Sequence, residues 1–386
     1  MRINITDKKG CCGCTACESI CTRHAILMKA DELGFMYPHV EDEKCVDCGR
    51  CIKVCQFHKN YNRWGNYNTP KVYAIRNKSQ ELLSGSQSGA AFYTFSDFCL
   101  RQGYVVYGAV LDEVFRVKHL RGISSEDRDR MLNSKYVQSD MRGIYKKVKE
   151  DLIDGTKVLF SGTPCQVAGL KAFLGQRWQQ NLITIDLVCH AVPSPAVWRS
   201  YIEWIEKKYG SKIEEVRFRD KRFGWNIHFE TFKLANGKFL KRSTFRDLFY
   251  AHYMVRESCS NCPFTNLNRV GDVSIGDFWG WFSISDRFND NRGVSLLLVN
   301  SDQGKQLLDS CASELEIIES NTKECLQPQL KEPIKLNPQY RQFIRDFNQK
   351  GFEYIGKKYA DLGWRHRRAK GIEWLKRVVK KIICFR

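Results

Sequence analysis

Long apolar segments are missing from this sequence of 386 residues. Its first residues, MRINITDKKGCC, lack the apolar stretch of a signal peptide, so we expect no secretory signal. No apolar run approaches the roughly 20 residues that a membrane-spanning helix needs. Hydrophobic residues still make up 43% of the chain, enough for a sizeable core, which argues against global disorder. These features predict a soluble, cytoplasmic protein.

Acidic residues are also scarce. The 43 Asp and Glu are outnumbered by 62 Lys and Arg, which gives a formal charge of +19. Such an excess suits nucleic acid, an anionic membrane surface, acidic proteins or phosphorylated ligands, and by itself selects none of them. Part of the excess is local, because residues 357–386 contain 11 Lys or Arg and only two acids, Asp361 and Glu373.

Cysteine, in contrast, is plentiful, with 17 in the chain and nine of them before residue 56. Two runs have the pattern C-x2-C-x2-C-x3-C: Cys11, Cys14, Cys17 and Cys21, then Cys45, Cys48, Cys51 and Cys55. Two such runs bind two 4Fe–4S clusters, and the fourth cysteine of each run crosses to the other cluster. Structural zinc is the alternative, but zinc ligands usually come as two separated pairs. Electron transfer is therefore our first hypothesis.

Two details depart from the usual form of these runs. Cys12 is surplus, and we interpret it as a spacer rather than a ligand. The proline that commonly follows the fourth cysteine is replaced by Thr22 in the first run and by Gln56 in the second. These replacements affect local rigidity and cluster potential, and they remove no ligand.

A second domain is predicted after the polar linker of residues 59–70, where residues 71–75 alternate like a strand. A Ser/Gly turn at 84–89 then leads into a helical pattern. Such a turn offers N–H groups and hydroxyls to a phosphate or an anionic ring edge. Ordinary helix capping explains the same residues equally well. The segment FRDKRFGW, residues 218–225, mixes cations with aromatic rings, which suits a flat anionic ligand but also an ordinary strand surface.

Four further cysteines either follow a predicted strand or form a C-x2-C pair: Cys165, Cys189, Cys259 and Cys262. Cys165 opens a helix, whose dipole would lower the pKa of its thiol. Cys189, followed by His190, ends a strand, where an α/β sheet commonly delivers functional groups. Three interpretations are open: a third cluster, which the spacing favours slightly, a zinc site, and buried free thiols.

Together these segments resemble the beta-subunit family of coenzyme F420-reducing hydrogenases and dehydrogenases. The matching pieces, in chain order, are the double cysteine run, SGSQSGAAF, SKYVQSD, LFSGTPCQVAGLKAFL, DLVCHAVPSPAVW, FRDKRFGW, and CSNC followed by VSIGDFWG. They cover about residues 8–285. Reductases of the chlorophyll cycle and proteins of bacterial surface-polysaccharide clusters belong to the same superfamily.

The resemblance implies FAD and a third 4Fe–4S cluster beside the first two. By motif, the flavin would be bordered by Ser86, Ser88, Gly89, Lys135 and Thr163, and the third cluster would be held by Cys165, Cys189, Cys259 and Cys262. Lys135 and His190 are the candidate catalytic groups near the flavin. Ala90 departs from the family pattern, because such turns often carry a second glycine there.

We therefore expect an α+β protein, with a small bicluster ferredoxin domain followed by an α/β flavin-binding domain that has a mixed sheet. The expected parts are a 4Fe–4S domain at 1–60, the two parts of the flavin domain at 70–150 and 151–330, and a basic helical tail at 331–386. Within the tail, residues 371–383 have the periodicity of a basic amphipathic helix. Such a helix contacts an anionic membrane, here at the inner face. Packing on its own domain is the slightly favoured alternative.

The favoured function is an oxidoreductase that passes electrons between ferredoxin-type clusters and FAD, with hydride transfer to or from a small-molecule substrate. Surface-polysaccharide biosynthesis is one setting that the resemblance suggests. An electron-transfer subunit that relays electrons to a separate catalytic protein is the alternative. A cluster-bearing nucleic-acid-binding or sensor protein is a remoter one, supported by charge alone. We expect an electron donor or acceptor protein such as ferredoxin as partner, and not nucleic acid.

Overall fold

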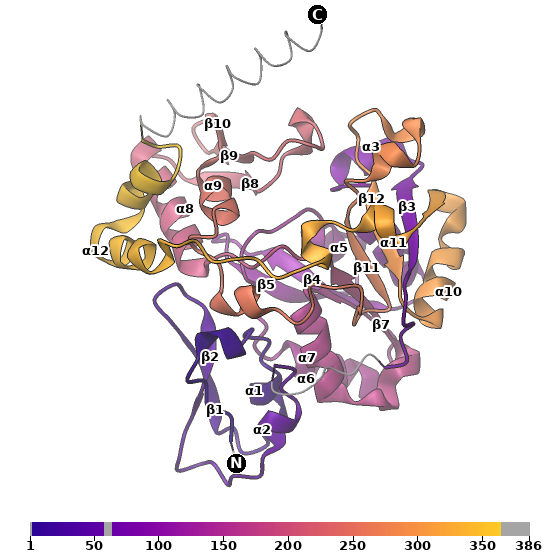
Figure 1. Cartoon of the computed structure of the whole chain (residues 1–386), viewed down its shortest axis with the longest axis horizontal. Coiled ribbons are helices and arrows are strands. Elements are labelled where there is room, and N and C mark those ends of the chain that lie inside the picture. Colours follow the sequence, from indigo (N-terminus) through magenta and orange to yellow (C-terminus); the bar gives the residue numbers. More distant parts are fainter. Residues whose placement is uncertain (1, 58–63, 364–386) are drawn as a thin grey trace, which may run out of the picture.

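The chain folds into a small N-terminal module, a large central sheet and a second, smaller sheet (Figure 1). The computed structural model describes residues 2–57 and 64–363. The helix predicted over residues 371–383, and with it the expected membrane contact, lies outside these residues. Among the residues described, no helix has the length and apolarity to cross a bilayer.

The N-terminal module combines one hairpin with short helical turns. Strands β1 (Ile26–Ala30) and β2 (Met36–Val40) pair antiparallel. The helical elements are η1 (Lys8–Gly10), α1 (Ala16–Ile20) and α2 (Arg50–Lys53). Thr15 and Gly49 precede α1 and α2 with left-handed φ angles of 68° and 72°. These two residues let the chain reverse sharply between successive cysteines.

The central sheet has eight strands in the order β13-β3-β12-β11-β7-β6-β4-β5. Their bounds are β3 (Lys71–Asn77), β4 (Val105–Leu111), β5 (Val117–Gly122), β6 (Val158–Gly162), β7 (Leu182–Leu187), β11 (Val273–Asp277), β12 (Ser295–Val299) and β13 (Leu315–Ser320). The pairs β4–β6, β6–β7 and β7–β11 are parallel, and the other pairs are antiparallel. β6 and β12 are buried at every residue, as strands covered on both faces are. The mixed sheet expected from the sequence is confirmed.

The helices α3 (Gln80–Gly85), α4 (Ala91–Arg101), α5 (Ser125–Met131), α6 (Ile144–Ile153), α7 (Pro164–Leu174), α10 (Asp302–Ser310) and α11 (Thr322–Cys325) accompany this sheet (Figure 1). Short 3-10 turns lie at η2 (Gln176–Asn181), η3 (Lys221–Phe223), η4 (Glu257–Asn261), η5 (Trp281–Ser283), η6 (Asp286–Phe288), η7 (Ala312–Glu314) and η8 (Pro328–Leu330). Helix α7 directly follows β6, with Pro164 in its first turn and the Thr163 N–H bonded to Gln166 Oε1 at 2.9 Å. This strand–turn–helix unit aims Cys165 at the N-terminal module.

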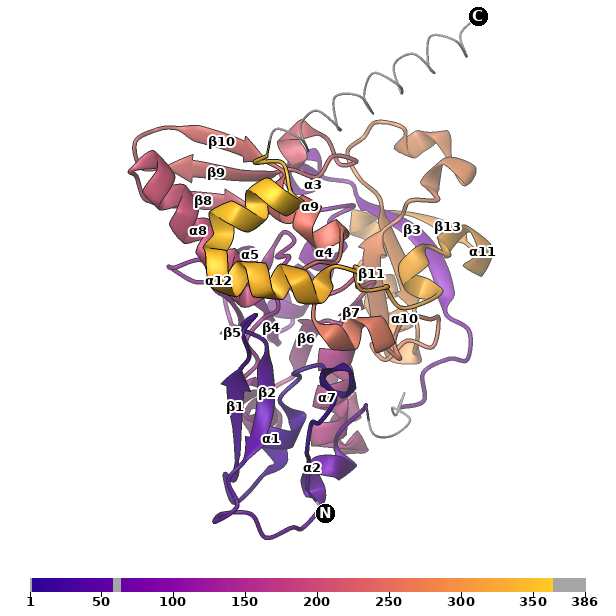
Figure 2. The same cartoon turned by 60° about the vertical axis from the view of Figure 1, so that its left-hand side comes forward.

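The second sheet is antiparallel, in the order β10-β9-β8, and is covered by helices (Figure 2). Its elements are α8 (Pro195–Tyr209), β8 (Ile213–Arg217), β9 (Glu230–Leu234), β10 (Phe239–Arg242), α9 (Thr244–Tyr250) and α12 (Tyr340–Tyr359). Trp198, Tyr201 and Phe245 are fully buried in its core. Helix α12 bends at Gly351, which has a φ of 73°. The domain bounds predicted from the sequence did not separate this unit, and those bounds stay a prediction.

Candidate functional site

The N-terminal module brings cysteines of its two runs together. One small cavity is lined by Cys21 of the first run and by Cys45, Cys48 and Cys51 of the second. This is the crossed arrangement expected for one of two clusters in a ferredoxin-type module. Cys48 is exposed, so this end of the module faces solvent.

The remaining cysteines of the two runs also lie close to one another. Burial raises the pKa of the Cys17 thiol, and negative charge on Cys11 and Cys55 raises it further. Cys17 and Cys55 pack with the apolar residues Ile3 and Ile26. A metal centre would have to displace the proton that this environment favours. Their assignment as cluster ligands remains a prediction.

The four later cysteines converge from three elements. Cys165 lies in the first turn of α7, Cys189 follows β7, and Cys259 and Cys262 come from η4 and its end. The expected lowering of the Cys165 pKa by the helix dipole is wrong. The Cys12 thiol and burial raise that pKa well above its ordinary value. Burial and the neighbouring thiolates likewise raise the pKa of Cys189.

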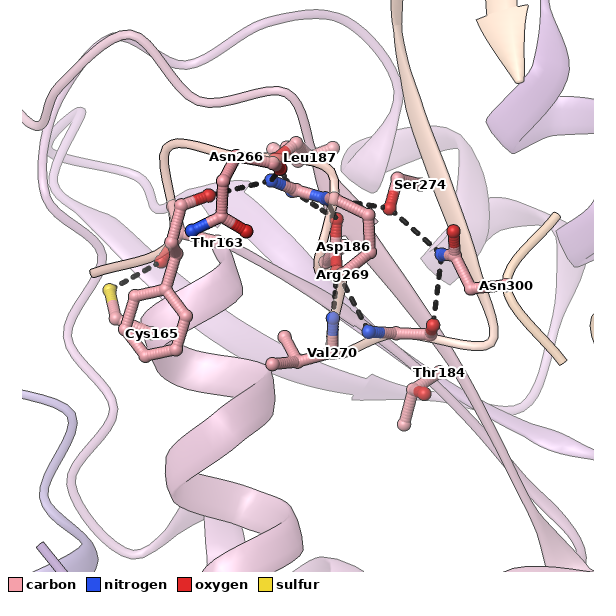
Figure 3. Close-up of polar contacts among 12 residues, drawn as sticks. Thr163, Cys165, Thr184, Asp186, Leu187, Asn266, Arg269, Val270, Ser274 and Asn300 are labelled. Carbon is pink, nitrogen blue, oxygen red and sulfur yellow. Dashed lines mark hydrogen bonds and ion pairs between the residues drawn. The ribbon is translucent and has the colours of Figure 1, made fainter. Parts of the chain in front are cut away.

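Arg269 fixes the loop after Cys262 to the end of β7 (Figure 3). Its buried guanidinium donates to Asp186 Oδ1 at 2.5 Å and to the Phe264 carbonyl at 2.8 Å. Both side chains of the Arg269–Asp186 ion pair are about fully buried. The pair therefore connects the segment just after Cys262 with the end of the strand that precedes Cys189.

These four thiols, from three elements, match in number and type the four cysteines that an iron–sulfur cubane binds. Within residues 2–57 and 64–363, no three or more His, Cys, Asp or Glu side chains are arranged so that they could bind a single metal ion. The donors are all cysteines, which are soft ligands that suit iron–sulfur clusters.

Cys12 lies between the two sets of thiols. It is 8% exposed and hydrogen-bonds Cys14 on one side and Cys165 on the other. Gly169 on α7 allows this close packing, since a Cβ there would stand 2.8 Å from Cys14 Sγ. The residue interpreted as a spacer thus contacts both the N-terminal module and the later cysteines.

A cavity of about 410 Å³ opens beside the later cysteines. Most of the predicted flavin and catalytic residues line it: Ser86, Ser88, Lys135, Thr163 and His190, with Cys189. Gly89 does not. It lies behind the lining, where its N–H donates to Ser295 Oγ at 2.8 Å and a Cβ would stand 2.2 Å from the Ile75 carbonyl. Cofactor sites commonly have volumes of about 300–1,000 Å³.

The loop that carries Ser86 and Ser88 is held by Lys221. The Lys221 ammonium donates to the carbonyls of Leu83, Ser86 and Ser88 at 2.5, 3.0 and 2.7 Å. Two buried polar atoms of this loop, Ser86 Oγ and Gln87 Oε1, have no hydrogen-bond partner in the described part of the chain. Buried polar atoms are normally paired. Their position at the cavity fits a polar ligand such as a flavin.

The pKa values of both candidate catalytic residues are lowered, which favours their neutral forms. Burial lowers the pKa of Lys135 to about 7, and its ammonium donates to the Leu132 carbonyl at 2.6 Å. Burial and His252 lower the pKa of His190 to about 4. His190 Nδ1 accepts from Gln329 Nε2 at 2.7 Å, so its Nε2–H donates to His252 at 2.8 Å. Their catalytic roles stay a prediction.

The sequence did not reveal His119, which also lines the cavity. His119 Nε2 donates to the Ser161 carbonyl at 2.9 Å, so Nδ1 accepts from the Ser139 hydroxyl at 2.6 Å. The ring stacks on Phe160, with centroids 5.5 Å apart. No motif marks His119, because it stands in an ordinary strand and meets its partners only through the sheet.

An aromatic and charged rim surrounds part of the cavity. Trp279 is 42% exposed and stacks on Trp225 with centroids 4.8 Å apart. Asp277 accepts from Trp225 Nε1 at 2.8 Å and also pairs with Arg219. The Arg219 guanidinium lies 5.4 Å from the Trp279 ring. The segment 218–225 therefore supplies a cation and an aromatic support beside the cavity, as its composition suggested.

We expect His119 to make the fold sensitive to acid. Burial lowers its pKa from 6.5 to about 4, so the unfolded chain binds the proton more readily than the folded chain. Burial of the neutral His119 ring therefore contributes folding stability that is fully present above about pH 6.5. This contribution is lost as the pH falls toward about 4. Urea midpoints at about pH 7 and about pH 5 should therefore differ less in His119→Gln than in the wild type. His39→Gln, at an exposed position, should keep the wild-type difference. An unchanged difference in His119→Gln would contradict the prediction.

The fold and the cysteine sets define an iron–sulfur protein on a mixed α/β sheet. Comparison with known families matches residues 10–59 to a 4Fe–4S dicluster domain. Residues 155–324 match the C terminus of the coenzyme F420 hydrogenase/dehydrogenase beta subunit. Over residues 155–324 the chain is therefore similar to this oxidoreductase-like beta-subunit family, and it carries a 4Fe–4S dicluster domain ahead of that region. The resemblance seen in the sequence is confirmed, and iron–sulfur electron transfer follows from it.

Comparison with curated proteins gives no significant match. Among solved structures, one similar chain comes from a xenon derivative of the F420-reducing NiFe hydrogenase complex of Methanosarcina barkeri. It is 17% identical, with a TM-score of 0.46, and the match covers 79% of this chain and 98% of that chain.

Proposed function

We propose that this chain is an iron–sulfur flavoenzyme in which a third cluster connects the N-terminal clusters with FAD in the cavity. Cys189 carries this proposal, because it belongs to the later set of thiols and also lines the cavity. On the other side, Cys12 joins Cys14 of the N-terminal module to Cys165. A cluster on the later cysteines would therefore stand between the electron-carrying module and the cavity.

FAD, when bound, would supply the exchange between single electrons and a hydride. The residues of the chain would bind and orient the flavin. Ser86, Ser88 and Thr163 line the cavity, and the Ser86 hydroxyl, which has no partner among the described residues, would be available to a polar ligand. Lys221 holds the loop that carries Ser86 and Ser88. Lys135, with a pKa of about 7, can hold or release a proton near neutral pH.

The rim formed by Arg219 and Trp279 would position a small substrate next to the flavin. A planar molecule can stack on the exposed Trp279 ring, next to the ion pair of Arg219 with Asp277. We infer an unidentified small redox substrate, and surface-polysaccharide precursors are among the candidates. The solvent-facing end of the N-terminal module, at Cys48, is suited to an electron donor or acceptor protein such as ferredoxin.

The alternative is an electron relay without its own hydride chemistry. The same sets of thiols support it, because they connect a solvent-facing module with the cavity that Cys189 lines. In that case the cavity would bind part of a catalytic partner or remain without flavin. The two functions differ in cofactor content and can be separated by one measurement.

Anaerobic purification with iron, sulfide and flavin quantified together tests the proposal. We expect about twelve irons per chain, from three cubane clusters, and about one flavin. About eight irons would reject the third cluster. Iron and sulfide without flavin, even after incubation with FAD, would reject the flavoenzyme and favour the relay.

A further inference from the structure

Arg256 is a fully buried cation that the proposed reaction does not use. It lies three residues before Cys259, has 0% exposure, and reaches into the N-terminal module. Its Nε donates to the Cys11 carbonyl at 2.7 Å, and its Nη2 donates to the Met36 carbonyl at 2.9 Å. Nη2 also lies 3.6 Å from Cys11 Sγ. The guanidinium therefore joins the two parts of the chain at the first cysteine of the first run.

Two further contacts hold Arg256 in place. Gln138 Oε1 accepts from Arg256 Nη1 at 2.9 Å, while Gln138 Nε2 donates to the Cys12 carbonyl at 2.8 Å. The guanidinium also lies over the Tyr37 ring at 4.2 Å. Gly13 leaves room for it, since a Cβ there would stand 2.8 Å from Arg256 Nη1. The motif SKYVQSD thus contributes, through Gln138, to the junction with the N-terminal module.

The charge of Arg256 lacks an ordinary counter-ion. Another fully buried arginine, Arg269, pairs with the buried Asp186. Across residues 2–57 and 64–363, the side-chain partners of Arg256 are Gln138 and the Cys11 sulfur, with no carboxylate in an ion pair. A buried charge is costly unless an opposite charge compensates it. The groups around the cation are instead the Cys11 sulfur, at 3.6 Å, and the Tyr37 ring, at 4.2 Å.

A cubane cluster with four thiolate ligands is negatively charged in both redox states and gains one further negative charge on reduction. A fixed cation in a low-dielectric environment stabilises the more negative state more strongly. Hydrogen bonds to cluster sulfur act in the same direction and are known determinants of cluster potential. Arg256 supplies both effects at Cys11.

We propose that Arg256 is the counter-ion of the cluster bound by Cys11 and that it raises the reduction potential of this cluster. It is a positioning and tuning residue, which acts on electrons through the cluster. The proposal rests on the clusters of the proposed function. Since Arg256 belongs to the segment that leads to Cys259, the same side chain sets the separation of the first and third cluster sites.

The test compares Arg256→Met and Arg256→Gln with Arg256→Lys by anaerobic potentiometric titration followed by EPR. The relevant signal is the one that disappears in Cys14→Ser. At a fixed potential, the ratio of reduced to oxidised cluster should be about tenfold smaller in the neutral variants than in the wild type. This corresponds to a reduction potential that is lower by about 59 mV for one electron. Arg256→Lys keeps the charge and should shift much less. Arg128→Met, which removes a buried arginine paired with Asp97, should leave the potential unchanged.

Equal potentials in the wild type and in neutral variants that retain their iron would overturn the proposal. Loss of this cluster from the neutral variants but not from Arg256→Lys would support it, because charge would then be needed for assembly. Loss from all three variants would overturn the charge argument. The iron content of the wild type distinguishes failure of the proposed function from failure of the Arg256 proposal. A wild type without clusters refutes the proposed function itself, whereas loaded clusters with an unchanged potential refute only the role of Arg256.

Discussion

Replacing Cys259 with serine is expected to remove about four of about twelve irons and to stop reduction of bound FAD by the N-terminal clusters. Iron–sulfur clusters prefer soft thiolate ligands, and serine offers a hard oxygen instead. The loss should be confined to the third cluster, because Cys259 lies outside both N-terminal runs. Iron and sulfide analysis measures the first effect. Single-turnover reduction of the flavin by reduced ferredoxin, followed by absorbance, measures the second.

The matched control for this experiment is Cys325→Ser. Cys325 is also buried, at 2% exposure, but belongs to α11 and donates to the Thr322 carbonyl within its own turn. This variant should keep all its iron and normal flavin reduction. Full iron content in Cys259→Ser would reject the third cluster and leave the four later cysteines as buried thiols. Lost iron with normal flavin reduction would remove that cluster from the electron route.

Features encoded by short spacing could be predicted from the sequence. The two cysteine runs, the strand–turn–helix unit around Cys165 and the strand before Cys189 depend on neighbours within a few residues. Several single strands followed from apolar segments, whereas the mixed sheet that joins them was expected together with the family resemblance. The pKa of Cys165 could not be predicted this way. The helix dipole is a local feature, but the thiol of Cys12, from a distant part of the chain, outweighs it.

Residues whose role depends on distant partners were missed or misplaced. Lys221 binds carbonyls that lie 133 to 138 positions earlier in the chain, and Arg256 reaches Cys11 across 245 positions. Gly89 belongs to the predicted motif, yet it serves the packing of β3 against β12 and not the lining of the cavity. A motif shows that a segment is used, but tertiary contacts decide which of its atoms face the ligand.

Replacing Lys221 with methionine is expected to weaken FAD binding by at least about tenfold, or ~1.4 kcal/mol. Lys221 does not line the cavity, but its ammonium donates hydrogen bonds to the Leu83 carbonyl of α3 and to the Ser86 and Ser88 carbonyls of the loop. A single buried carbonyl left unpaired costs ~1–3 kcal/mol, so the loop should rearrange. Fluorescence titration of flavin-free protein with FAD measures the effect. Lys241→Met, at an exposed position of β10, should bind FAD like the wild type.

The pH dependence separates this role from general destabilisation. Burial lowers the pKa of Lys221 to about 8, so its ammonium is lost as the pH rises through that value. A neutral amine has one fewer N–H to donate and no charge to oppose the carbonyl dipoles. FAD affinity of the wild type should therefore fall above about pH 8, while Lys221→Met should bind weakly on both sides of it. A variant that binds FAD normally would show that the contacts of Gly89 with Asn77 and Ser295 are enough to hold the loop. A wild type with no loss of affinity above pH 8 would show that the ammonium charge is unnecessary.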